Sequence, residues 1–99
     1  MKIGKSENFK LERIISTGQV TPEGEWYDQE KDEWVILLQG NAKLLFEKNY
    51  NDKIENKIIE LKKGDYLFIK KHEKHRVIYT SQDPPCIWLA LHGDMEKTE

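Results

Sequence analysis

Eight consecutive residues carry the clearest structural signal in this chain: Glu33-Trp34-Val35-Ile36-Leu37-Leu38-Gln39-Gly40. The run from Trp34 to Leu38 is continuously apolar, and most of its residues favour extended backbone. Gly40 ends the run soon afterwards. A short apolar run bounded by a turn residue is typical of a strand that is buried on both faces. The stretch therefore predicts such a strand, with the carboxylate of Glu33 at its start.

Apolar and polar residues alternate on both sides of this run, which predicts further short strands. They cover residues 9–15, 42–47, 54–61, 66–69, 77–79 and 86–91. Turn residues separate them, and the clearest hairpin tip is Asn49-Tyr50-Asn51-Asp52. A helix over 48–60 is disfavoured because asparagines and an aspartate open it and its isoleucines prefer strands. About eight short strands at this spacing predict an all-β sandwich or barrel.

Length and composition limit the remaining possibilities. With 99 residues the chain has room for one domain, 1–99, and its polar ends at 1–8 and 94–99 are predicted to be loose. The net charge of -2 comes from mixed signs without a basic block, so neither nucleic acid nor a membrane is an expected partner. Cys86 is the only cysteine and no apolar leader is visible, so we expect a cytoplasmic protein.

Two segments resemble the sequence motifs of small single-domain bacterial cupins. Glu33 and Gly40 match the end of the first motif, G-x5-H-x-H-x(3,4)-E-x6-G. Gly64 and His75 are spaced as in the second, G-x5-P-x-G-x2-H-x3-N. The resemblance implies a cupin-type jelly-roll barrel (a double-stranded β-helix of antiparallel strands), with a central cavity.

The chain departs from the family pattern where the family binds metal. Tyr27 and Gln29 stand at the positions of the two first-motif histidines, so the equivalents of the usual three histidines and one glutamate are Tyr27, Gln29, Glu33 and His75. If one strand carried Tyr27, Gln29 and Glu33, their side chains would share a face. An amide oxygen is a weak ligand for a transition metal, and a tyrosine would first have to lose its proton.

His72 is the additional candidate ligand. It lies three residues before His75, and in a tight turn the two rings could converge on the cavity. Gln29, Glu33, His72 and His75 would then form a two-histidine, one-carboxylate set for Fe, Ni, Mn or Zn. The alternative is that His72 lies at the mouth of the barrel, and that Glu33 is paired with His75 or Arg76 without any metal. Asp32 and His92 are expected to be exposed, and Cys86 to be a small buried residue.

Three functions remain open. The first is a module that binds a small organic ligand through Tyr27, Gln29, Glu33 and His75. The second is a metal-dependent enzyme of the dioxygenase, isomerase or decarboxylase type that uses His72, His75 and Glu33. The third is metal-free acid–base catalysis in which Glu33 orients His75. Most aromatic residues are expected in the core, and Tyr27 and Trp88 in the cavity wall. A homodimer is also expected, with Trp26 and Trp34 in its interface.

Overall fold

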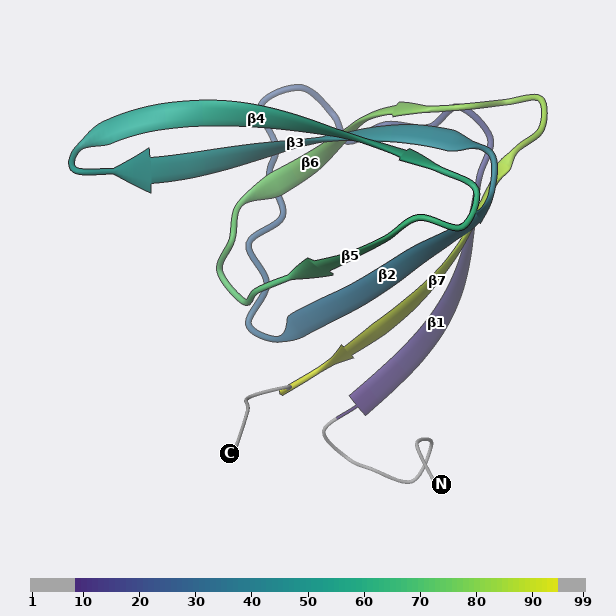
Figure 1. The fold of residues 1–99 in the computed structure, drawn as a ribbon, viewed down its shortest axis with the longest axis horizontal. Helices are drawn as coiled ribbons and strands as arrows, with labels where there is room; N and C mark the ends of the chain where they lie inside the picture. The colour runs from purple at the N-terminus through teal and green to yellow at the C-terminus, as the bar shows by residue number, and fades with distance from the viewer. Residues whose placement is uncertain (1–8, 95–99) are drawn as a thin grey trace.

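The computed structural model describes residues 9–94, and these form seven antiparallel strands in two sheets (Figure 1). The strands are β1 (Phe9–Ser16), β2 (Asp32–Gln39), β3 (Asn41–Tyr50), β4 (Lys53–Lys62), β5 (Tyr66–Ile69), β6 (His75–Thr80) and β7 (Cys86–Gly93). The all-β prediction is confirmed, with seven strands in the described part of the chain where the pattern suggested about eight. Of the ends predicted to be loose, 1–8 and 94–99, only Asp94 lies within the described residues, and its carboxylate accepts a hydrogen bond from Lys31 at 3.2 Å.

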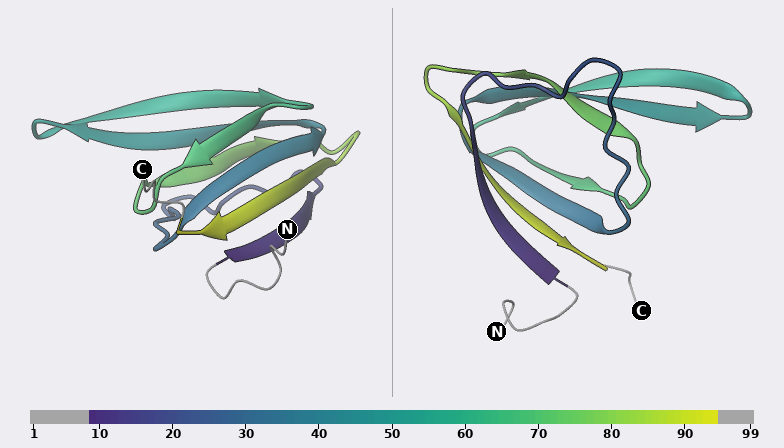
Figure 2. Two further views of the ribbon diagram at one scale, coloured as in Figure 1. Left: turned by 60° about the horizontal axis from the view of Figure 1, so that its bottom comes forward. Right: turned by 180° about the vertical axis from the view of Figure 1, so that it is seen from behind.

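The two sheets have the strand orders β1-β7-β2-β5 and β4-β3-β6. Figure 2 shows them as two layers, with the first sheet twisted beneath the second. Strands adjacent in a sheet are mostly distant in sequence, as in β7, which lies between β1 and β2. This is a jelly roll, and it confirms the fold that the motif resemblance implied.

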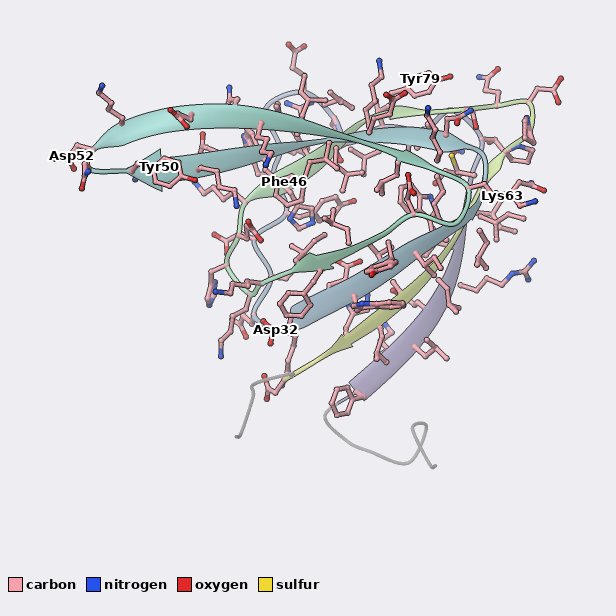
Figure 3. The ribbon with its side chains drawn as sticks, viewed as in Figure 1. Asp32, Phe46, Tyr50, Asp52, Lys63 and Tyr79 are labelled. Atoms are coloured by element: carbon pink, nitrogen blue, oxygen red, sulfur yellow. The ribbon has the colours of Figure 1, made fainter. Side chains whose placement is uncertain are left out.

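The predicted hairpin tip joins β3 to β4. Tyr50 pairs with Lys53, so the turn consists of Asn51 and Asp52, both with left-handed backbone (φ 46° and 68°). Asparagine and aspartate tolerate this conformation better than other side-chain-bearing residues, which is why they favour two-residue hairpin turns. The tip projects beyond the rest of the fold, with Tyr50 and Asp52 at its end (Figure 3).

The core lies between the sheets and is built from side chains of both. Its buried apolar members are Val35, Leu37, Ala42, Leu44, Phe46, Leu61, Ile69, Cys86, Trp88 and Ala90. Cys86 is thus a small buried residue, as predicted. The β2 run differs from expectation: Val35 and Leu37 are buried, whereas Trp34 and Leu38 are 36% and 42% exposed. One face of β2 packs in the core, and the other lies on the outside of the sheet.

No helix within the described range could cross a membrane, because that part of the chain is built from strands and connecting turns.

Candidate functional site

A cavity of about 360 Å³ opens between the sheets and is partly covered by the segment that links β1 to β2. Apolar side chains contribute most of its wall, and its polar members come from four places: β1, the linking segment, β2 with β7, and β6. The polar lining residues are Glu12, Ser16, Gln19, Thr21, Tyr27, Gln29, Glu33, His75 and His92. The cavity therefore contains all four residues that the motif alignment assigned to ligand binding, and Trp88 lies in its wall as predicted.

Tyr27 and Gln29 reach the cavity from the linking segment and not from β2. Tyr27 forms an isolated antiparallel bridge with His75, in which its amide donates to the His75 carbonyl at 2.8 Å. The His75 amide donates back to the Tyr27 carbonyl at 3.1 Å. The expectation that Tyr27, Gln29 and Glu33 share one strand is thus wrong, because residues between Ser16 and Asp32 follow β6 before the chain enters β2. The three side chains nevertheless reach the same cavity.

Thr21 bonds the segment between β1 and β2 to β6 at a second point. Its amide donates to the Val77 carbonyl, and its hydroxyl oxygen accepts from the Val77 amide, both at 2.9 Å. Arg76 adds a bond from its guanidinium to the Thr21 carbonyl at 3.2 Å. These hydrogen bonds pair backbone groups that would otherwise be unsatisfied. They therefore hold the segment between β1 and β2 in one position over the cavity.

His75 is 4% exposed and lies between two rings. Tyr27 stacks on one side and Phe46 on the other, each with its centroid 5.5 Å from the imidazole. Nδ1 lies 2.9 Å from the carbonyl oxygen of Glu73. Because a carbonyl can only accept, Nδ1 carries the proton, and in the neutral ring Nε2 is left as the acceptor. His75 is therefore held rigidly, with Nε2 as its chemically available atom.

Glu33 lies on the inner face of β2, opposite His92 of β7. Burial raises the pKa of the Glu33 carboxyl, while His92 and His75 oppose the shift and Glu12 adds to it. His92 Nε2 lies 3.1 Å from a carboxylate oxygen of Glu12. Glu33 lies directly opposite His92, and His92 contacts Glu12 diagonally, so the three side chains are neighbours on one wall of the cavity.

Two of these three residues, Glu12 and His92, were not expected at the cavity from the sequence. His92 was expected to be exposed, but its side chain is 19% exposed and lines the cavity. His92 has the same parity in β7 as Cys86, Trp88 and Ala90, all of which are buried, so extending the predicted strand 86–91 by one residue would have placed it inside. Glu12 gave no comparable signal, because an acidic residue in an alternating strand is ordinarily exposed.

His72 lies elsewhere. Its backbone is left-handed (φ 64°), its amide donates to the Gln29 carbonyl at 2.8 Å, and its ring bonds to Asp28 at 2.9 Å. The side chain is 62% exposed and does not line the cavity. The turn brings His72 to the surface beside Asp28, and does not bring it together with His75.

Asp32 also differs from expectation. It is 8% exposed and accepts a hydrogen bond from the Lys71 amide at 2.8 Å, so it ties the start of β2 to the turn before β6. Figure 3 shows it at that end of β2.

The donor groups do not fit a resident metal ion. Within residues 9–94, no three His, Cys, Asp or Glu side chains gather closely enough to hold one. His72 faces solvent, and Tyr27 and Gln29 are poor replacements for two imidazoles. The cavity residues therefore support binding through hydrogen bonds, stacking and charge.

The fold is a small jelly roll with an internal cavity, and comparison with solved structures identifies its class. A protein of Ralstonia eutropha JMP134, provisionally named a mannose-6-phosphate isomerase, is 37% identical over 90% of this chain and 77% of its own, with a TM-score of 0.75. A cupin superfamily protein of Desulfitobacterium hafniense DCB-2 is 17% identical over 90% and 70%, with a TM-score of 0.69. No protein-family profile and no curated protein matches the chain.

Oxalate decarboxylase of Bacillus subtilis, an enzyme with Mn(II) centres, has a TM-score of 0.70 at 17% identity. The match covers 96% of this chain and 23% of that one, so it shows a shared fold. Together with the 37% identical relative, these structures place the chain: it belongs to the cupin superfamily.

Proposed function

We propose that this protein binds a small organic molecule in its central cavity through Tyr27, Gln29, Glu33 and His75. The observation that carries the proposal is that these four side chains, predicted from motif positions, line one cavity of about 360 Å³. That volume lies within the usual range for small-molecule sites, which are mostly apolar with a few fixed polar groups. The site has this composition.

The charges of the wall favour a particular kind of ligand. Two carboxylates, Glu12 and Glu33, line the cavity, while lysine and arginine are absent from its wall among the described residues. The accepting atoms of the wall include carboxylate oxygens, the amide oxygens of Gln19 and Gln29, hydroxyl oxygens and Nε2 of His75. A ligand with a cationic or hydrogen-bond-donating head and an apolar or planar body would satisfy this wall. A phosphate ester would meet two carboxylates without a lysine or arginine in the wall to compensate its charge.

Geometry gives less support to the two catalytic alternatives. A metal-dependent enzyme using His72, His75 and Glu33 would need His72 in the cavity, and its ring is instead bonded to Asp28. Acid–base catalysis with Glu33 orienting His75 would need a bond between them. The carbonyl of Glu73 holds Nδ1 of His75 in place of the Glu33 carboxylate.

Metal content and ligand class can be tested together. The protein is purified without a histidine tag or chelator and its bound metals are measured by elemental mass spectrometry. Small organic amines and phosphate esters of matched size are then titrated by calorimetry. We expect substoichiometric metal, amine binding that is weakened at least about tenfold by Glu33→Gln, and no phosphate-ester binding.

The matched control is Glu60→Gln, which removes an exposed carboxylate of β4 outside the cavity and leaves binding unchanged. Near-stoichiometric metal that is lost in His75→Ala would overturn the proposal in favour of the metal-dependent enzyme. Binding of phosphate esters but not amines would contradict the assigned ligand class.

A further inference from the structure

β4 is an edge strand of the smaller sheet, and one side of its backbone is open. The strand order β4-β3-β6 pairs it with β3 alone within residues 9–94. Figure 2 shows the β3–β4 hairpin projecting beyond the body of the fold. Every residue from Lys53 to Ile58 is exposed. The amide and carbonyl groups along such an edge can pair with a strand of another chain.

Two large apolar side chains stand on the exposed half of β4. Ile54 and Ile58 are 64% and 60% exposed, and with Asn56 midway between them they lie on the face that is turned away from the core. The contacts within the chain leave these isoleucines in water. A second strand laid along this edge would cover part of both.

Two charged side chains of the same segment also lack a partner. Glu55 and Lys57 flank Asn56 and point to the other face of the sheet. Within the described range neither of them forms an ion pair, because Lys48, which lies opposite Glu55 on β3, bonds to Glu73 instead. Both charges are therefore available to another chain.

The segment is complementary to itself about Asn56. A two-fold axis perpendicular to the sheet places one residue of an edge strand opposite its own copy. With Asn56 on the axis, Ile54 lies opposite Ile58 of the other copy, and the same pair recurs by symmetry. On the other face, Glu55 lies opposite Lys57 of the other copy, again twice. Apolar residues thus meet apolar residues, and opposite charges meet.

Other symmetric registers fit less well. An axis through Glu55 or through Lys57 would place like charges directly opposite each other. An axis through Ile54 would bring the ladder to the hairpin turn after a single further pair on each side. An axis through Ile58 would leave both charges without a partner of opposite sign.

We propose that β4 pairs antiparallel with β4 of a second copy, with Asn56 on the two-fold axis, so that the smaller sheets of both copies join into one continuous sheet. Charged residues on an edge strand ordinarily oppose such pairing, and here their order favours this register over the others. The ladder over 53–59 is smaller than a standard interface, so we expect a reversible, concentration-dependent association. Neither Trp26 nor Trp34 lies on β4, so this contact differs from the homodimer interface expected from the sequence.

Disulfide trapping at the axis tests the contact directly. Asn56→Cys places two thiols opposite each other across an antiparallel pair, within the reach of a disulfide, and the native Cys86 is buried. With diamide as the oxidant, we expect a covalent dimer in non-reducing electrophoresis. The matched control is Asn49→Cys, an exposed position on the same face of the sheet but on β3. It should crosslink at least about tenfold more slowly, because its thiols meet only by collision.

Charge reversal tests the register. In the Asn56→Cys background, Lys57→Glu or Glu55→Lys places like charges opposite each other at two points, and each should slow crosslinking at least about fivefold. The double reversal restores two pairs of opposite charge and should return the rate to near its original value. Thermal unfolding verifies that each variant is folded, which is expected because all three positions are exposed.

Equal crosslinking of Asn56→Cys and Asn49→Cys would show that the β4 edge does not pair, and the proposal would fail. It would also fail if the single reversals left the rate unchanged, or if the double reversal did not restore it, because the copies would then meet in a different register. Association through another surface does not imitate the expected result, since the disulfide reports contact at Asn56 itself.

Discussion

Tyr27 and His75 are joined twice, by a reciprocal pair of backbone hydrogen bonds and by the stacking of their rings. The backbone bonds hold the segment between β1 and β2 against β6, and the stack covers one side of a buried imidazole. Because the two attachments use different groups, side-chain substitutions can remove the stack without removing the bridge. This relationship allows the contribution of each attachment to be measured separately.

Tyr27→Phe should keep the stack and leave the free energy of unfolding within about 0.5 kcal/mol of the wild-type value. Tyr27→Ala should lower it by about 1–2 kcal/mol, because the ring contact and part of the shielding of His75 are lost. Urea unfolding followed by tryptophan fluorescence measures both. Equal losses in the two variants would show that the hydroxyl, and not the stack, carries the stability.

The pH dependence of stability reports on Glu33. Because burial raises the pKa of its carboxyl above the ordinary 4.5, the folded protein retains this proton at pH values where the unfolded chain has released it. The contribution of Glu33 to stability is therefore most favourable below pH 4.5, and it declines as the pH rises through the raised folded value. Without bound ligand, Glu33→Gln should be more stable than the wild type at neutral pH.

The difference between the two proteins should shrink as the pH falls below 4.5, where the wild-type carboxyl becomes protonated in both the folded and the unfolded state. Comparing the proteins at each pH removes the common contribution of the remaining titrating groups. A wild type that is more stable than Glu33→Gln at neutral pH would show that the carboxylate is stabilised by a partner in the cavity.

The two motif glycines should respond differently to alanine. Gly40 and Gly64 both have left-handed backbone, with φ of 94° and 91°. A Cβ at Gly40 would lie 2.7 Å from Ser81 Oγ and 2.9 Å from Cys86 Sγ, whereas a Cβ at Gly64 meets nothing within 4 Å. Gly64→Ala should cost about 1 kcal/mol of unfolding free energy and Gly40→Ala about 2–4 kcal/mol, measured by urea unfolding. Equal costs would mean that backbone strain alone explains both positions.

His72→Gly should retain both stability and ligand binding. Glycine relieves a left-handed conformation that costs other residues about 1–2 kcal/mol, and this gain offsets the greater freedom of the unfolded chain and the loss of the exposed contact with Asp28. The net change in unfolding free energy should be within about 1 kcal/mol. His72→Val, which is branched at Cβ, should destabilise the turn. A loss of ligand binding in His72→Gly would show that His72 contributes to the binding site.

Much of the local structure could be predicted from residue patterns. Alternation located six strands and the continuous apolar run located β2, while Asn51 with Asp52 marked the β3–β4 turn. Each of these signals depends on residues that are neighbours in the chain. Motif spacing selected Tyr27, Gln29, Glu33 and His75, and all four line the cavity. Local pattern did not reveal that Tyr27 and Gln29 lie outside the strand of Glu33, since the bonds that place them go to β6 and its preceding turn, more than forty residues away.

What the sequence by itself determined is therefore the all-β class, the turns and four residues of the site. Only the tertiary structure decided that Glu12 and His92 join Glu33, that His72 lies at the surface, and that one side of β2 lies on the outside of its sheet. The physical reason is that side-chain periodicity sets which residues of a strand share a face. Which strands become neighbours, and which face is covered, depends on pairing between distant segments, and a single strand does not encode that pairing.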